Sequence, residues 1–392
     1  MVGLAGVHGE ALGQHGTGQL LRDQAAGCGR VGGRGPGSRR GAACDCLRNE
    51  RFSGARNTSR GDRKVTATED DRPHSQADTR PPGAAQVRIS VIIPTFNART
   101  TLRCCLLSLL HQRIGAHGSD AGPPFTYEVI VVDDGSSDGT SEMIAQFPSR
   151  LDLRYTFLPR TDRSGRARAR NAGLALATGG LVVTLDADQV VEPHFLAEHA
   201  RLHAGGPGRV VAGRRLQLAD GPMDEARLEH GFDPQALPPV VRGDEREQLF
   251  RLLDSSLEDM VTGWHHVWTC NASFPRDRLE AVGGFDETFT GWGLEDAELA
   301  YRLVQGGATT HFAPSAVVRH EHRTPVTADM YREWCRNLAH FVRRHPAPEV
   351  RLQEIFAPAI DPDRSAPGTW DDIAAEFEHT ARRLGAAPGR HR

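Results

Sequence analysis

The sequence predicts an α/β domain in which a mostly parallel sheet is flanked by helices. Between residues 88 and 185, short β-branched runs alternate with segments whose apolar residues recur at helical spacing. This alternation is typical of repeated strand–helix–strand units. The 392 residues are enough for one large domain with further segments. No apolar run reaches the roughly 18–20 residues that cross a bilayer, and a formal net charge of −3 argues against a nucleic-acid-binding protein.

Residues 1–87 differ from the rest of the chain. They hold 16 of the 42 glycines and a single aromatic residue, Phe52. A segment this poor in apolar residues cannot offset the entropy lost on ordering. We expect a disordered low-complexity tail, or a leader that precedes the true start of the protein.

The expected elements follow in order from Arg88. Residues 88–93 (RISVII) form a short apolar run closed by a proline, which is typical of a buried parallel strand. Leucines and cysteines then recur at helical spacing through 102–110, where the adjacent Cys104 and Cys105 are expected to be buried free thiols. Further strands are predicted at 127–132, 154–158 and 180–185, and a further helix at 166–177.

Polar turns follow three of these strands, at 94–97, 133–136 and 186–188. Ligands of such sheets bind beyond the carboxyl ends of the strands, so the turns predict one shared site. Asp186 and Asp188 can reach one cation, or a cation and a ribose; the alternative is helix capping, because a helix can open near residue 192.

Other residues near these turns suggest a nucleotide. Asp133 and Asp134 can accept hydrogen bonds from a base or ribose, although turn chemistry also explains them. Phe96 offers a flat face for a base, with a core position as the alternative. Five arginines lie between residues 160 and 170; some of them can meet a diphosphate, or the run can be a solvated face.

A second cluster lies about 100 residues further on. Its sequence, GWGLED, covers residues 291–296. Glycines flank Trp292, whose ring can stack on a sugar. Glu295 and Asp296 lie at the expected start of a helix, where an ionised carboxylate is favoured and can act as a base, with capping as the alternative.

A strand expected at 317–322 ends in His320 and His322. One of these imidazoles could join Asp188 on a metal ion, and such a mixed ligand set suits Mn²⁺ or Mg²⁺.

Together the motifs resemble family 2 glycosyltransferases of the GT-A (nucleotide-diphospho-sugar transferase, Rossmann-like) fold. The first half resembles them in SVIIPTFN (90–97), VDDGSSDGT (132–140), ARNAG (169–173) and DAD (186–188). The second, with GGFD (283–286) and GWGLED (291–296), is similar to a galactosyltransferase-type C-terminal module found in chondroitin-polymerase-like and polypeptide N-acetylgalactosaminyltransferase-like enzymes. The resemblance covers about residues 88–323.

The resemblance implies a role for each site residue. Donor-binding residues would be Pro94, Thr95, Phe96, Asp133, Asp134, Arg170 and Asp186. Asp188 and His320 would bind the metal, with His322 as the alternative to His320. Asp296 would be the catalytic base, and Trp292 and Glu295 would bind the acceptor.

It also implies a division of the chain. Residues 88–204 would be the nucleotide-sugar-binding half, 205–324 the acceptor-binding and catalytic half, and 325–392 a helical extension. Helices are expected there at 328–344 and 370–384, the first with an apolar stripe of Tyr331, Cys335, Leu338 and Phe341. We expect this stripe to pack on the domain, with peripheral membrane contact as the alternative.

The expected function is inverting, metal-dependent transfer of a sugar from a nucleoside diphosphate donor, a UDP-sugar above all, to the hydroxyl of a glycan, lipid-linked or small-molecule acceptor. No nucleic-acid partner is expected. Free thiols favour a cytoplasmic protein. Two alternatives stay open: a non-catalytic sugar-nucleotide or glycan-binding protein, and a sugar-1-phosphate nucleotidylyltransferase. The latter would need a glycine-rich loop after the first strand, where this chain has Pro94–Asn97.

Overall fold

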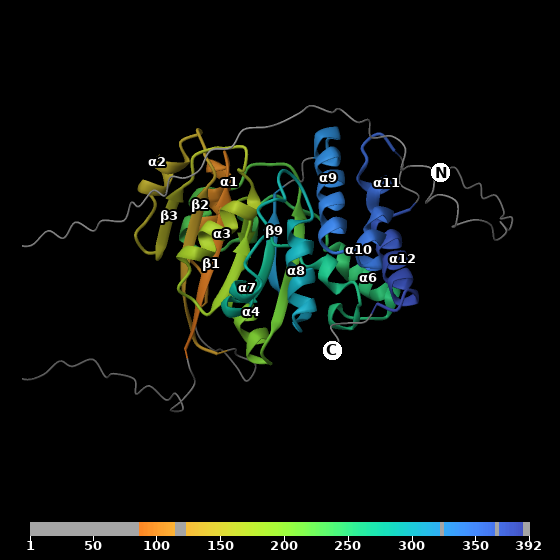
Figure 1. Cartoon of the computed structure of the whole chain (residues 1–392). Coiled ribbons are helices and arrows are strands. Elements are labelled where there is room, and N and C mark those ends of the chain that lie inside the picture. Colours follow the sequence, from red (N-terminus) through yellow and green to blue (C-terminus); the bar gives the residue numbers. More distant parts are fainter. Residues whose placement is uncertain (1–85, 114–122, 322–324, 365–367, 387–392) are drawn as a thin grey trace, which may run out of the picture. The chain divides into compact units, whose positions relative to one another are not determined.

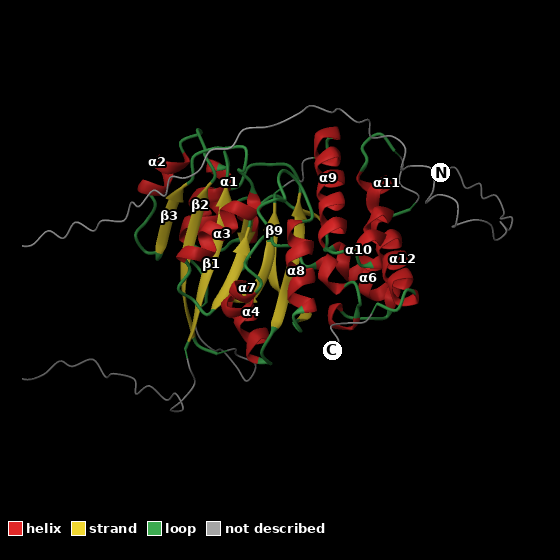
Figure 2. Ribbon diagram, viewed as in Figure 1, coloured by secondary structure: helices red, strands yellow, loops and turns green. Residues whose placement is uncertain are grey.

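The computed structural model describes residues 86–113, 123–321, 325–364 and 368–386. The expectations for residues 1–85 and for His322 therefore lie outside the described residues. Helices and strands alternate along much of the described chain, and the strands share one sheet (Figure 2).

The described residues contain nine strands, whose bounds are β1 (Val87–Thr95), β2 (Phe125–Asp133), β3 (Leu153–Phe157), β4 (Leu181–Leu185), β5 (Gln189–Val191), β6 (Arg209–Leu218), β7 (Val240–Arg242), β8 (Asn271–Pro275) and β9 (Thr309–His320). Their order in the sheet is β3-β2-β1-β4-β8-β6-β9-β5, and β7 pairs with β6. The labelled strands β3, β2, β1 and β9 follow this order from left to right in Figure 1.

The α-helices of the described residues are α1 (Arg99–Leu109), α2 (Thr140–Ala145), α3 (Arg166–Leu176), α4 (Phe195–Ala204), α5 (Glu225–His230), α6 (Glu245–Leu253), α7 (Arg276–Ala281), α8 (Glu295–Gln305), α9 (Ala328–Arg344), α10 (Pro348–Arg351), α11 (Ala357–Ile360) and α12 (Trp370–Arg383).

The first part of the sheet has the predicted form. Strands β3, β2, β1 and β4 run parallel, and β6 runs parallel to β9. The strands and helices expected between residues 88 and 185 are present, with ends that shift by one to three residues. The sequence did not indicate β8, which runs antiparallel between β4 and β6 and joins the two parts into one sheet. The α/β class with a mostly parallel sheet is confirmed.

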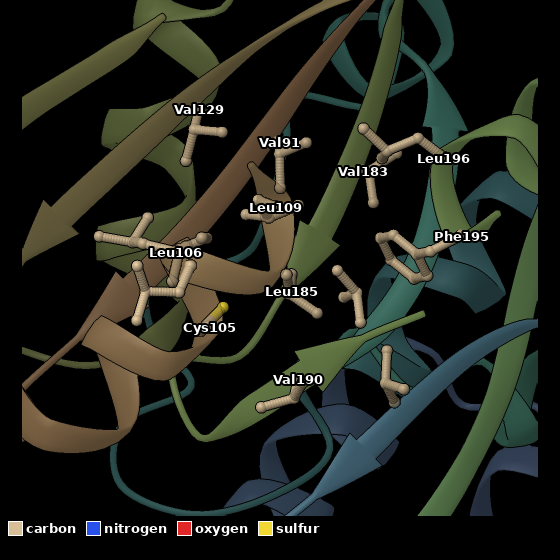
Figure 3. Close-up of a cluster of buried hydrophobic side chains, with 14 of the residues drawn as sticks. Val91, Cys105, Leu106, Leu109, Val129, Val183, Leu185, Val190, Phe195 and Leu196 are labelled. Atoms are coloured by element: carbon tan, nitrogen blue, oxygen red, sulfur yellow. The ribbon is translucent and has the colours of Figure 1, made fainter. Parts of the chain in front are cut away.

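Both faces of the sheet are covered, as expected for parallel strands. Alternate residues of a strand point to opposite faces, so β1 contributes Val91 to one core and Ile92 to the other. The first core lies between the sheet and helices α1 and α4, with Leu106 and Phe195 among its members (Figure 3). Cys105 is buried in the same core as a free thiol, and Cys104 is likewise buried and free, as predicted.

The second core lies under α3, α8, α9 and α12, around the buried ring of Trp264. Helix α9 buries Trp334, Leu338 and Phe341 in it. The expected stripe was therefore wrong at one position, because Cys335 is exposed and Trp334 faces the core instead. Within the described residues, no helix is both long enough and apolar enough to cross a membrane.

Candidate active site

The polar turns that follow β1 and β2 lie next to each other. Thr95 and Asp133, the last residues of these two strands, are paired in register. The backbone N–H of Asp134 donates to the carbonyl of Thr95 over 2.9 Å, and that of Asn97 donates to Ser136 Oγ over 2.8 Å. The shared edge predicted from the sequence is therefore present for these two turns.

Asp133 uses both carboxylate oxygens inside the protein. Its Oδ1 accepts from the backbone of Ser136 over 2.7 Å, and its Oδ2 accepts from the Tyr155 hydroxyl over 2.8 Å. The residue is buried, so these bonds make it part of the turn's framework. A contact between Asp133 and a nucleotide stays a prediction.

Asp134 and Phe96 lie beside the same arginine. Arg160 places its guanidinium 4.0 Å from the centroid of the Phe96 ring and donates to Asp134 Oδ2 over 2.9 Å. Arg168 approaches the other Asp134 oxygen at 3.3 Å. Phe96 is 45% exposed, which excludes the core position left open by the sequence. An aromatic face, a carboxylate and a guanidinium therefore lie together at the end of β1.

Arg170 joins the two halves of the expected site. Its buried guanidinium donates to Asp186 Oδ1 over 2.9 Å and to Glu295 Oε1 over 3.1 Å. Burial by itself would lower the pKa of Arg170, but the carboxylates of Asp186 and Glu295 outweigh it and raise the pKa. The arginine is thus held charged between the turn after β4 and the start of α8.

Asp188 and His320 form a pair across β5 and β9. Gln189 and His320 are in register, which brings His320 Nε2 to 3.4 Å from Asp188 Oδ2. Burial acts to raise the pKa of Asp188, but the hydrogen bond and charge of His320 outweigh it, and the net shift is downward. Asp188 Oδ1 and His320 Nδ1 are buried atoms without a hydrogen-bond partner.

The facing carboxylate and imidazole are groups that can bind a divalent cation. A carboxylate oxygen and an imidazole nitrogen are ligands that Mn²⁺ accepts, and Mg²⁺ accepts the oxygen. Among the described residues, which exclude His322, no group of three or more His, Cys, Asp or Glu side chains is placed to hold a metal. Two protein ligands would therefore leave positions for the oxygens of a diphosphate and for water.

Helix α8 begins at Glu295, as expected, so Glu295 and Asp296 lie in its first turn. Leu294, directly before them, has a φ of 75°, which sets the direction in which the helix leaves the loop. Burial and the charge of Glu295 raise the pKa of Asp296 to about 7. The backbone N–H of Ala297 donates to Asp296 Oδ1 over 2.8 Å. A carboxyl with this pKa exchanges a proton readily near neutral pH.

The residues that hold these loops could not be recognised from the sequence. Trp292 is partly buried, and its backbone N–H donates to Glu333 of α9 over 2.9 Å. Asn171 of α3 binds both the N–H and the carbonyl of Phe285, at 2.8 and 2.9 Å. Both supporting residues come from helices distant in sequence. The ARNAG motif included Asn171, but no spacing indicated its partner.

The described residues also form two surface hollows. One, of about 430 Å³, is lined by residues of α1, α2 and α5, including Arg99 and Glu225. The other, of about 350 Å³, lies between the end of α6 and α12. Neither contains a predicted site residue, so the chemistry is assigned from the side chains at the strand ends.

Two family models match consecutive parts of the chain. Residues 90–261 match the model described as glycosyl transferase family 2. Residues 255–325 match the model described as an N-terminal domain of galactosyltransferase, and this segment contains the GWGLED loop and His320. The boundary between the models falls before β8.

Curated relatives agree with these matches. Validoxylamine A glucosyltransferase of Streptomyces hygroscopicus subsp. limoneus is 34% identical over 287 residues, which cover 68% of this chain and 58% of the relative. Pre-mycofactocin glycosyltransferase of Mycobacterium tuberculosis (strain H37Rv) is 30% identical over 72% of this chain and 52% of the relative. The chain thus matches between half and two thirds of the length of these relatives.

Among solved structures, the mannosyltransferase PcManGT from Pyrobaculum calidifontis, in complex with GDP-Man and Mn²⁺, is 23% identical. It covers 79% of this chain and 73% of its own, with a TM-score of 0.42. The two sequence models and the curated relatives support the family, and the parallel β3-β2-β1-β4 segment agrees with the mostly parallel sheet expected from the sequence. By sequence, residues 90–261 therefore belong to family 2 of the glycosyltransferases, and residues 255–325 match the galactosyltransferase model.

Proposed function

We propose that this protein transfers a sugar from a nucleoside diphosphate donor, a UDP-sugar first of all, to an acceptor hydroxyl, with inversion at the anomeric carbon and with a divalent metal. The observation that carries the proposal is the buried Arg170, which binds Asp186 on the donor side and Glu295 on the acceptor side. It brings the turn after β4 and the first turn of α8 into one charged cluster that also includes Asp296.

Asp296 is the proposed base. Its carboxylate would take the proton of the acceptor hydroxyl while the acceptor oxygen forms a bond to C1 of the sugar. The bond between C1 and the diphosphate oxygen would break in the same step, and the nucleoside diphosphate would leave. One displacement inverts the configuration at C1. Because the pKa of Asp296 is about 7, the residue is both sufficiently ionised and sufficiently basic near neutral pH.

Asp188 and His320 are the proposed metal ligands, because their carboxylate and imidazole face each other and each carries a buried atom without a partner. A bound Mn²⁺ or Mg²⁺ would neutralise charge that develops on the departing diphosphate. Arg170, fixed by two carboxylates, would keep Asp186 oriented toward the ribose or the metal.

The end of β1 is the proposed base-binding region. Phe96 would stack on the base, and Asp134 would accept a hydrogen bond from a base N–H group. Arg160 now covers the Phe96 ring and binds Asp134. It would therefore shift, or stack on the base itself, when the nucleotide binds.

The acceptor is proposed to be small or glycan-like. The relative at 34% identity is named for glucosyl transfer to validoxylamine A, which makes UDP-glucose the first donor to test. Trp292 and Glu295 would contact the acceptor, because they lie on either side of the turn that leads to Asp296.

The test is a donor panel with the full-length protein. UDP-, GDP- and TDP-sugars are incubated with Mn²⁺ and with a set of p-nitrophenyl glycosides, and nucleoside diphosphate release is measured. Release from one donor, increased by an acceptor, supports transfer. Consumption of pyrophosphate with formation of a nucleoside triphosphate would instead identify a nucleotidylyltransferase. Binding of a donor without turnover would identify a non-catalytic protein.

A further inference from the structure

Helix α9 holds the loop that carries Trp292 at two points. Asn337 Nδ2 donates to the backbone carbonyl of Gly293 over 2.8 Å and lies 3.2 and 3.3 Å from the carbonyls of Thr290 and Trp292. One helical turn earlier, Glu333 Oε2 accepts from the backbone N–H of Trp292 over 2.9 Å. Together, Glu333 and Asn337 bind the main chain on both sides of the Trp292 side chain.

The two glycines of the loop allow this close approach. A Cβ on Gly291 would lie 2.4 Å from the Glu333 carboxyl carbon, and a Cβ on Gly293 would lie 3.1 Å from the Trp334 ring. Both glycines also have positive φ angles, of 76° and 93°, which residues with side chains rarely adopt. The two glycines of the G-W-G sequence therefore allow the loop to approach α9 more closely than residues with side chains could.

Helix α9 is in turn fixed against α8. Helices α8 and α9 are neighbours (Figure 1). Phe341 of α9 packs 5.8 Å from Tyr301 of α8, between ring centroids, and His345 Nε2 lies 2.9 Å from Glu298 Oε1. Glu298 lies one turn after Glu295 in α8. The helix that binds the Trp292 loop, α9, therefore also packs against α8, whose first turn carries Glu295 and Asp296.

We propose that Glu333 and Asn337 are positioning residues that set the orientation of Trp292 for the acceptor. The inference depends on the proposed function, because it assumes that Trp292 contacts the acceptor sugar. Neither side chain would touch the reacting atoms. Both act through the backbone of residues 290–293, so their loss should weaken acceptor binding and leave the nucleotide site at the ends of β1 and β2 unchanged.

The test compares Glu333→Ala, Glu333→Gln and Asn337→Ala with Arg336→Ala, which changes an exposed residue of the same helix. The Gln variant keeps an oxygen that can accept from the Trp292 N–H. We measure the dissociation constant of UDP, the KM for the most active p-nitrophenyl glycoside, and hydrogen exchange of the 290–297 backbone. The Ala variants at 333 and 337 should raise the acceptor KM about tenfold or more, and speed exchange in the loop. UDP binding should be unchanged, and Glu333→Gln and Arg336→Ala should resemble the unmodified protein.

Two results would distinguish a failure of the positioning role from a failure of the proposed sugar transfer. If the unmodified protein transfers sugar but Glu333→Ala and Asn337→Ala keep its acceptor KM and its exchange rates, the positioning role is wrong. If no donor is turned over by the unmodified protein, the proposed function is wrong. In that case only hydrogen exchange tests whether Glu333 and Asn337 hold the loop. Exchange in Glu333→Ala and Asn337→Ala as slow as in the unmodified protein would show that they do not.

Discussion

Asp296 is the single residue whose chemistry decides the mechanism. Replacing it by Asn removes the base and keeps the shape, so transfer should fall about 10²- to 10⁴-fold. UDP affinity should stay the same, because Asp296 lies on the acceptor side. Steady-state kinetics and UDP titration check both parts, and near-normal turnover in Asp296→Asn would remove the residue from the mechanism.

The pH profile gives a second check on Asp296. With its pKa raised to about 7 by burial and the Glu295 charge, the carboxyl is protonated below that value, so kcat/KM should decline as the pH falls below about 7. The native-state pKa exceeds that of the unfolded chain, so ionisation of Asp296 destabilises the fold as the pH rises from about 4 toward 7. Asp296→Asn should therefore gain stability relative to the unmodified protein over this range, measured by thermal unfolding.

Asp188 is predicted to be required for the effect of a divalent metal on UDP binding. Asp188→Ala removes the unpartnered Oδ1, so added Mn²⁺ should no longer increase the affinity for UDP. Binding of UDP without metal should change little. Asp277→Ala, which changes an exposed carboxylate on α7, is the matched control and should keep the Mn²⁺ effect. An unaltered Mn²⁺ effect in Asp188→Ala would exclude this pair as the metal site.

At the scale of elements, helix α3 positions Arg170 by packing closely on the sheet. A Cβ on Gly173 would lie 2.4 Å from Ile92 Cγ2 of β1 and 3.3 Å from Val132 Cγ2 of β2. Gly173→Ala should destabilise the protein by about 1–3 kcal/mol, since overpacking exceeds the gain of about 1 kcal/mol in helix propensity.

Denaturant unfolding measures this effect of Gly173→Ala. Gly180→Ala is the control, because a Cβ there meets no atom within 4 Å, and its free energy of unfolding should change by less than about 0.5 kcal/mol. Equal stabilities of the two variants would mean that α3 can move away from β1 without cost.

For the whole molecule, the sequence predicted what depends on local pattern. The buried runs that became β1, β2 and β4 are continuous and apolar, so their ends, and the turns at Thr95, Asp133 and Asp186, could be placed. The start of α8 at Glu295 followed from GWGLED. Strand β8 could not be predicted, because the short segment 271–275 becomes a strand only by pairing with β4 and β6.

The partners of individual side chains also could not be predicted from the sequence. The bond from Arg170 to Glu295 spans 125 residues, and Glu333 binds a backbone group 41 residues away. Such pairs are decided by how helices dock on the sheet, which no local periodicity encodes. The buried polar residues have the same origin, and they affect how the whole molecule responds to acid.

Four histidines, of which His199 and His266 are fully buried and His203 and His265 half-buried, should make the folded protein sensitive to acid. Burial lowers the pKa of His199 and His265 to about 4, that of His203 to about 3, and that of His266 well below its ordinary value. Each stays neutral in the native state but gains a proton on unfolding below about pH 6.5. Asp296, with its raised pKa, releases one proton on unfolding at pH 5 and opposes them. On unfolding near pH 5, these five groups together should therefore bind about three protons, and the stability of the fold should decrease as the pH drops from 6.5 toward 4.

Thermal unfolding between pH 4.5 and 7.5 measures this dependence of stability on pH. His199→Asn, in which the smaller amide can still bond to Ser273, should reduce the slope of this dependence by about one proton. A slope that is the same in His199→Asn and in the unmodified protein would contradict the assignment of His199 as neutral in the native state.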